Sequence, residues 1–177
     1  MASKKSSHAW RPALFVFFIA CIFWLGASNI RAIIGYDLLK FDTFEFDEYL
    51  ATEAEGEIFR LLSFTSLVVI ASYIIALVSS IVFLATSPFR MKEHGWLLIS
   101  AILFYLFVPV EFFTMYLDGQ MFYQEFFATA DNQMLREIFI ARVGSLAGAP
   151  IIATLCYYTI VGLAVFQPLR KSRPLSA

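Results

Sequence analysis

The chain has 177 residues, of which 60% are hydrophobic and 15% are charged, and its net charge is −1. Soluble domains carry about 45–50% apolar and about 25% charged residues, so one water-facing domain of this length could not hide so much apolar surface. The near-zero charge leaves no basic face to neutralise phosphates, and we expect no nucleic-acid partner.

Four apolar runs are each long enough to cross a bilayer, which takes roughly 20 residues in a helix. The runs are residues 13–30, 61–89, 95–117 and 143–169. The first run resembles a signal peptide, but its length exceeds the roughly 7–15 apolar residues of a signal core, which favours a retained signal anchor. The sequence therefore predicts an all-α integral membrane protein, a bundle of four transmembrane helices.

The predicted chain is a single membrane domain over residues 1–177. Its transmembrane helices are expected at about 12–34, 60–87, 95–117 and 142–168. Between them we expect outer loops at 35–59 and 118–141, a cytoplasmic loop at 88–94 and a cytoplasmic tail at 169–177.

Basic residues predict the orientation, because they concentrate on the cytoplasmic side of membrane proteins. Eight of them lie in the N-terminal segment, the short middle loop and the tail: Lys4, Lys5, Arg11, Arg90, Lys92, Arg170, Lys171 and Arg173. The first outer loop instead holds eight acids, Asp37, Asp42, Glu45, Asp47, Glu48, Glu53, Glu55 and Glu57. We therefore expect both termini in the cytoplasm.

Both outer loops are rich in aromatic residues. The first carries Phe41, Phe44, Phe46 and Tyr49, and the second carries Phe122, Tyr123, Phe126 and Phe127 beside Met121. Aromatic side chains beside membrane helices favour the interface with the headgroups. We expect two ordered, partly helical segments there.

Small residues suggest where helices approach closely, because helix association in lipid depends on backbone contact. Ser72, Ala76 and Ser80 are spaced by four in the second span, and Gly144 and Gly148 form a GxxxG pattern in the fourth. These two faces are candidates for contact with each other or with another subunit.

Two prolines are expected to kink their helices, because an internal proline removes a backbone hydrogen bond. Pro109 lies in the third predicted span and Pro150 in the fourth. Both are expected at similar depth, towards the outer leaflet.

One polar cluster deserves a functional hypothesis, because an ionisable residue inside a membrane helix is costly. Glu111, Thr114 and Asp118 share a helix face by spacing, and Arg31 and Arg142 fall at a similar level. A Glu111–Arg31 or Glu111–Arg142 ion pair would be structural. The alternatives are a contact with a neighbouring subunit, or a site for an ion, a proton or a ligand.

No residue pattern predicts a cofactor, a metal site or a catalytic centre. Cys21 and Cys156 fall inside apolar runs, far in sequence from His8 and His94, so neither a zinc site nor a loop disulfide is expected. Serines of the second span have no histidine or lysine partner in sequence for nucleophilic work.

The sequence therefore favours a non-enzymatic multi-pass protein of the plasma or inner membrane. We expect an accessory, scaffolding or assembly subunit that contacts lipids and other membrane subunits or copies of itself. The alternatives are a small oligomeric channel or transporter that uses Glu111, and a lipid-binding protein.

Overall fold

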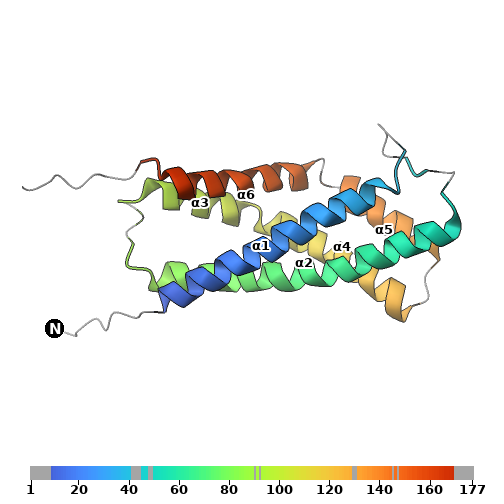
Figure 1. The fold of residues 1–177 in the computed structure, drawn as a ribbon, viewed down its shortest axis with the longest axis horizontal. Coiled ribbons are helices and arrows are strands. Elements are labelled where there is room, and N and C mark those ends of the chain that lie inside the picture. The colour runs from blue at the N-terminus through green and yellow to red at the C-terminus, as the bar shows by residue number, and fades with distance from the viewer. Residues whose placement is uncertain are drawn as a thin grey trace, which may run out of the picture. The chain divides into compact units, whose positions relative to one another are not determined.

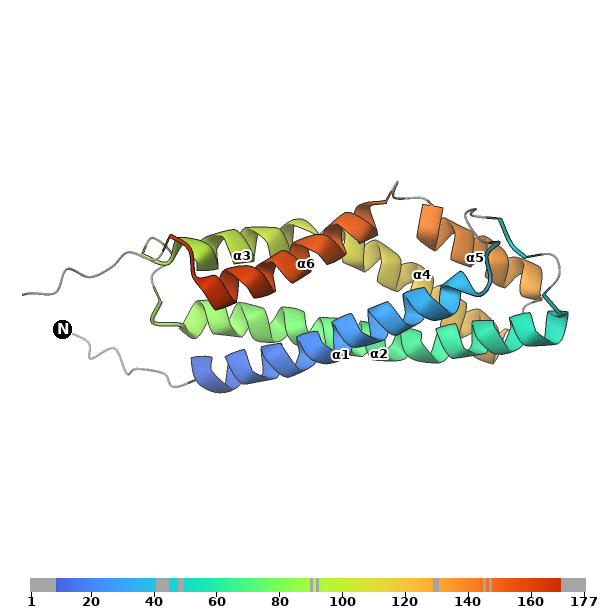
Figure 2. The same cartoon turned by 45° about the horizontal axis from the view of Figure 1, so that its top comes forward.

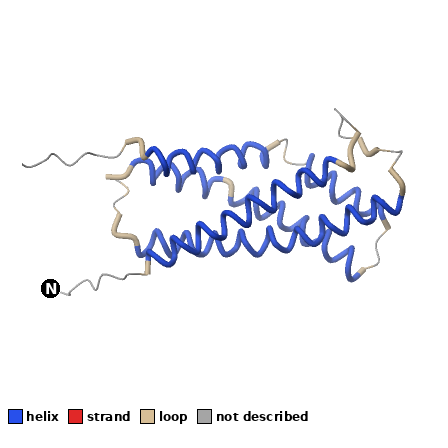
Figure 3. Tube along the Cα trace, in the orientation of Figure 1, coloured by secondary structure: helices blue, strands red, loops and turns tan. Residues whose placement is uncertain are grey.

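The structure is a computed structural model that describes residues 9–40, 45–47, 50–89, 91, 93–128, 131–144, 146 and 148–169. These residues form helices and no strand (Figure 3). The helices are α1 (Trp10–Tyr36), α2 (Thr52–Thr86), α3 (Gly95–Leu106), α4 (Val108–Phe127), α5 (Asn132–Gly144) and α6 (Ala149–Phe166). Four stretches are long and apolar enough to cross a membrane, namely α1, α2, the α3–α4 stretch Gly95–Phe127, and α6. The prediction of an all-helical protein with four candidate membrane spans is confirmed.

The chain divides into two compact units, which are described separately. The first unit is Met1–Ser87 together with Met115–Arg142, and the second is Pro88–Thr114 together with Val143–Ala177. The division falls inside α4, so this helix contributes residues to both units.

In the first unit, α1 lies along α2 over much of its length (Figures 1 and 2). The buried face of α2 repeats every three or four residues, as expected for one side of a helix, and includes Ser66, Val69, Tyr73 and Ala76. The ring of Tyr73 packs against Trp24 of α1, with centroids 4.8 Å apart.

The small residues singled out in the second span lie on this buried face. Ser72, Ala76 and Ser80 are all buried. The hydroxyl of Ser72 donates to the carbonyl of Val68, and that of Ser80 donates to the carbonyl of Leu77 at 2.7 Å. Each hydroxyl is thus satisfied inside its own helix, and the face can pack without a polar partner.

In the second unit, α3 lies beside α6 (Figures 1 and 2). Only Ala153 and Tyr157 of α6 are fully buried, and Phe104 of α3 packs on Tyr157 with ring centroids 6.1 Å apart. Since these two positions are one helical turn apart, α6 packs along a single narrow stripe within its unit.

The third predicted span is interrupted at Phe107, which separates α3 from α4 (Figure 3). Pro109 follows two residues later. Its ring nitrogen has no hydrogen to donate to the preceding turn, and the helix resumes with Glu111 donating its backbone N–H to the carbonyl of Phe107 at 3.0 Å. The break therefore lies where proline chemistry places it.

The fourth predicted span differs from expectation in two ways. Gly144 ends α5, and Gly148 precedes α6 with a φ of 83°, so they do not share one helix face. A Cβ added at either glycine would meet nothing within 4 Å among the described residues, so contact of these glycines with another subunit stays a prediction. Pro150 lies in the first turn of α6, where backbone N–H groups make no hydrogen bond within the helix. The lack of an N–H therefore costs nothing there, and Pro150 starts the helix and does not kink it.

Of the two segments expected to be outer loops, 118–141 is largely helical, whereas 35–59 is helical only at its two ends. In place of the boundaries at 60 and 117, α2 begins at Thr52 and α4 continues to Phe127, and α5 fills most of the remaining segment. Their polar residues form helices that extend past the apolar runs. Around the end of α1, Lys40 donates its N–H to the carbonyl of Glu45 at 2.8 Å, and Asp47 donates to that of Leu38 at 3.0 Å.

We predict that Ala76→Leu destabilises the protein by about 1–3 kcal/mol, because three extra carbons have no space on the buried face of α2. Ala71→Leu is the matched control, since Ala71 is exposed on the same helix. Thermal unfolding in detergent measures both variants. Equal melting temperatures would contradict the packing described for α2.

Candidate functional site

The carboxylate of Asp118 is the centre of a buried cluster in the first unit. Its side chain has no exposed surface and forms ion pairs with Arg31 and Arg142. Arg142 donates from Nε to Oδ1 at 2.5 Å and from Nη2 to Oδ2 at 3.4 Å. Arg31 contacts Oδ2 through Nη1. One carboxylate therefore forms ion pairs with two guanidinium groups.

Each member of the cluster comes from a different helix. Arg31 lies towards the end of α1, Asp118 lies in α4, and Arg142 lies in the last turn of α5. A cation in the last turn of a helix is stabilised by the negative end of the helix dipole. The cluster thus fixes three helices of the first unit to one another.

The cluster has more donors than acceptors. Arg31 is buried, and its Nη2 donates to the thioether sulfur of Met121 at 3.9 Å, a weak acceptor. Its Nη1 is paired with Oδ2 of Asp118, the carboxylate oxygen that also accepts from Nη2 of Arg142. Two guanidinium groups beside one carboxylate leave the cluster with one excess positive charge.

The structure brings together three of the five residues that the sequence grouped. Arg31, Asp118 and Arg142 meet in the first unit, whereas Glu111 and Thr114 belong to the second. The acid that pairs with both arginines is Asp118, which the sequence analysis placed on the polar face without assigning it an ion pair. An ion pair of Glu111 with either arginine stays a prediction.

Glu111 has a partner that sequence reasoning missed. The hydroxyl of Tyr157 in α6 donates to Oε1 of Glu111 at 3.0 Å. Tyr157 is buried against Phe104 and Phe107, so its position is fixed. Thr114 makes a local bond, donating to the carbonyl of Glu111 at 3.0 Å.

A second ion pair in the first unit was also missed. Glu55 of α2 is buried, and Arg136 of α5 binds it through both Nε and Nη2, the latter at 2.6 Å. The hydrogen bonds and the charge of Glu55 raise the pKa of Arg136 above its ordinary value. Because the pKa of Arg136 is raised, the pair contributes stability at neutral pH, and this contribution is lost in strong alkali as the pH rises through the raised value.

Aromatic rings enclose this second pair. Phe46, Phe59 and Phe139 pack together with centroids 6.0–6.5 Å apart, and the guanidinium of Arg136 lies 5.0 Å from the centroid of Phe46. Helical spacing could have indicated Glu55, because it shares a face with Phe59, Leu62 and Ser66 once α2 is extended to Thr52.

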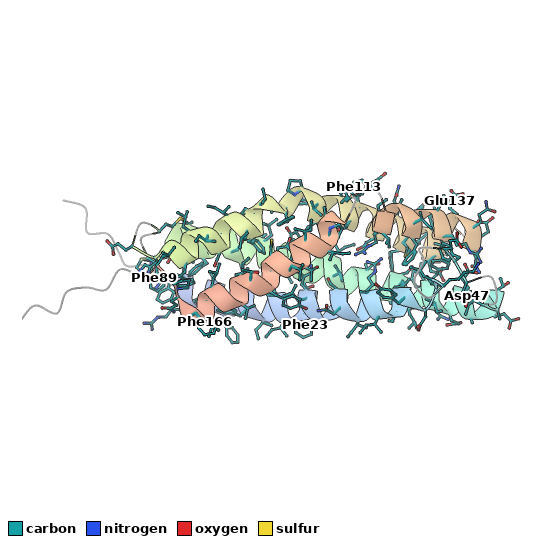
Figure 4. The ribbon with its side chains drawn as sticks, turned by 90° about the horizontal axis from the view of Figure 1, so that it is seen from above. Phe23, Asp47, Phe89, Phe113, Glu137 and Phe166 are labelled. Atoms are coloured by element: carbon teal, nitrogen blue, oxygen red, sulfur yellow. The ribbon has the colours of Figure 1, made fainter. Side chains whose placement is uncertain are left out.

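An apolar groove runs between α1 and α2 in the first unit. It has a volume of about 490 Å³, with Phe15, Ile19 and Phe23 on the α1 side and Leu67, Ala71 and Ser72 on the α2 side. A second groove of about 500 Å³ shares Val16 and Ile75 with it and continues towards the start of α1. Phe15 and Phe23 are 67% and 61% exposed, and Figure 4 shows Phe23 projecting outward from its helix.

We predict that Glu55→Gln lowers the free energy of unfolding by about 1–3 kcal/mol, because the change weakens a charge-assisted bond in a buried place. Glu57→Gln is the control. Glu57 lies on the exposed side of α2 and forms an exposed pair with Arg60 at 3.7 Å, worth less than about 1 kcal/mol. Denaturant unfolding in detergent compares the two, and an equal loss in both variants would contradict a specific role for the Glu55–Arg136 pair.

The first unit thus holds two sets of buried ion pairs and, lined by other residues, an apolar groove. No group of three or more His, Cys, Asp or Glu side chains within the described ranges is arranged to hold a metal ion. Comparison with known proteins found no match for the chain among protein-family models, curated proteins or solved structures.

Proposed function

We propose that this protein is a non-enzymatic accessory, scaffolding or assembly subunit of a larger membrane complex. The observation that carries the proposal is the groove between α1 and α2, which is apolar, exposed and continuous with a second groove. Its occupant in this proposal is a transmembrane helix of a partner subunit or of a second copy of the chain.

The composition of the groove supports this occupant. Ala71 is small and exposed in the groove and allows close backbone approach, which drives helix association in lipid. Phe15 and Phe23 lie on the α1 side and offer large contact areas. A helix that presented a ridge of side chains would fill the space between them.

The charged groups support a structural role. Asp118 is bound by two arginines and Glu55 by a third, so these buried acids are held by internal pairs. A general acid or base needs access to a substrate proton. Buried carboxylates that are already bound by arginines are better suited to holding helices together than to transferring protons.

The proposed orientation has both termini in the cytoplasm of the plasma or inner membrane. An even number of candidate spans returns the chain to its starting side. The basic residues of both termini and of the short middle loop support the cytoplasmic side. Most of these basic residues lie outside the described ranges, as do Phe41, Phe44 and Tyr49 of the first loop.

Copurification in mild detergent tests the proposal. We expect a partner protein or a second copy, identified by mass spectrometry, to stay bound to the full chain. Ala71→Leu adds bulk to the lining of the groove and should lower the amount of copurified partner several-fold. Ala85→Leu changes an exposed position of α2 that does not line the groove, and it should leave the amount of copurified partner unchanged.

A monodisperse monomer without a bound protein would contradict the subunit role. Equal retention by the Ala71→Leu and Ala85→Leu variants would contradict the groove as the contact. The melting temperature of the Ala71→Leu variant should stay near that of the unchanged protein, which separates loss of a partner from loss of folding.

A small channel or transporter is the second candidate, and the hydrogen bond between Tyr157 and Glu111 favours it. The pair places a titratable acid and a hydroxyl together inside two candidate spans, and such groups mark ion or proton pathways in membranes.

Glu111→Gln separates the two roles, because it keeps the acceptor for Tyr157 and removes the charge. If Glu111 lies in a pathway, proton or ion flux into liposomes falls about tenfold or more, or its pH dependence disappears, while copurification is unchanged. If the role is structural, flux is absent in both proteins. Tyr157→Phe is the control that removes the bond and keeps the acid.

A further inference from the structure

We propose that the Asp118 cluster binds the phosphate of a phospholipid headgroup through Arg142. The juxtaposition that carries this inference is two guanidinium groups on one carboxylate within the first unit. The proposal goes beyond the subunit role and requires no partner protein.

The charge balance is the first argument. Arg31 and Arg142 contribute two positive charges and Asp118 one negative charge, which leaves an excess of +1. The end of α5 supplies about half a negative charge to Arg142 through its dipole, which is too little to complete the neutralisation. Arg31 and Asp118 are closed to solvent and balance each other, so the excess charge falls on the partly exposed Arg142, where an anion would complete the neutralisation.

The hydrogen-bond donors give the second argument. Arg31 is almost fully buried, its Nη1 is paired with Oδ2 of Asp118, and its Nη2 has only the sulfur of Met121, a weak acceptor. Arg142 uses Nε and Nη2 on Asp118, and no described residue accepts from its Nη1. The cluster is therefore rich in donors and poor in acceptors, as an anion site is before its ligand arrives.

Access to the cluster is through Arg142. Its side chain is 23% exposed, whereas Arg31 and Asp118 are closed to solvent. Asp118 holds one edge of the Arg142 guanidinium and leaves Nη1 for an outside group. The planar fork of arginine suits a phosphate oxygen at this remaining edge. Arg31 does not contact the phosphate, and its positive charge adds to the electrostatic attraction at Arg142.

The position in the chain favours a lipid as the source of the phosphate. Arg31 directly follows the apolar run 13–30, and Arg142 lies seven residues before the last candidate span begins at Ala149. Residues at such boundaries lie at the depth of the headgroups. Free phosphate has the same chemistry, and the experiment distinguishes the two sources.

Native mass spectrometry of the full, delipidated protein tests the proposal. The probes are phosphatidylglycerol, a diacylglycerol with the same acyl chains and no phosphate, and inorganic phosphate. We expect one phosphatidylglycerol to bind about tenfold or more tightly than the diacylglycerol. Arg142→Gln should reduce this preference to about onefold. Arg136→Gln, a paired arginine of the same helix that is 40% exposed, should keep it.

A second variant tests the charge argument by a different measurement. Asp118→Asn raises the excess charge of the cluster, so its melting temperature should fall in phosphate-free lipid and rise on adding phosphatidylglycerol by more than in the unchanged protein. A merely structural Asp118 gives a fall that phosphatidylglycerol does not reverse, and this result would overturn the proposal.

Three further outcomes count against the inference. Equal binding of phosphatidylglycerol and diacylglycerol, or an unchanged preference in the Arg142→Gln variant, would overturn it. Protection by inorganic phosphate alone, with no preference between the two lipids, would overturn the lipid as the source.

Discussion

Ion pairing away from water is the constraint on which the first unit depends. Arg31, Asp118 and Arg142 come from α1, α4 and α5, and the fully buried Arg31 and Asp118 each need an opposite charge to stay ionised there. Since breaking such a set leaves uncompensated charge, the three helices hold a fixed register at this level. Glu55 and Arg136 apply the same constraint to α2 and α5. Together the two sets account for how polar segments remain ordered beyond the apolar spans.

The fold could be predicted where the signal was uninterrupted hydrophobicity, because lipid allows few structures to a long apolar run. The ends of the helices could not be. Polar, aromatic-rich segments read as loops, yet α2 begins at Thr52 because Glu55 and Phe59 find partners in α5. Gly144 and Gly148 were misread for a related reason: spacing alone assumes that the helix continues through both residues.

The site was predicted in its residue types and only partly in its pairing. Spacing along one helix showed that Asp118 lies on a polar face, but which acid meets which arginine depends on contacts between helices, and sequence separation carries no such information. Tyr157 illustrates this limit, since an aromatic residue in an apolar run gives no sign that its hydroxyl meets Glu111. In the two proposals, the groove between α1 and α2 would bind a partner helix, and the excess charge of the Asp118 cluster would bind a lipid phosphate. Both roles use surfaces of the first unit and do not compete for the same residues.

The length of α2 has a mechanical consequence. Its 35 residues span about 52 Å, of which the apolar residues 61–86 make up about 39 Å, against a hydrocarbon thickness of about 30 Å. Its polar first turns are held to α5 by the Glu55–Arg136 pair. Because this pair prevents α2 from shifting along its axis, α2 would match its apolar length to a thinner bilayer by tilting. Helix α1 packs along α2 and would tilt with it. The protein would therefore respond to bilayer thickness by a change of tilt, a property that sorts membrane proteins between compartments and couples them to the elasticity of their surroundings.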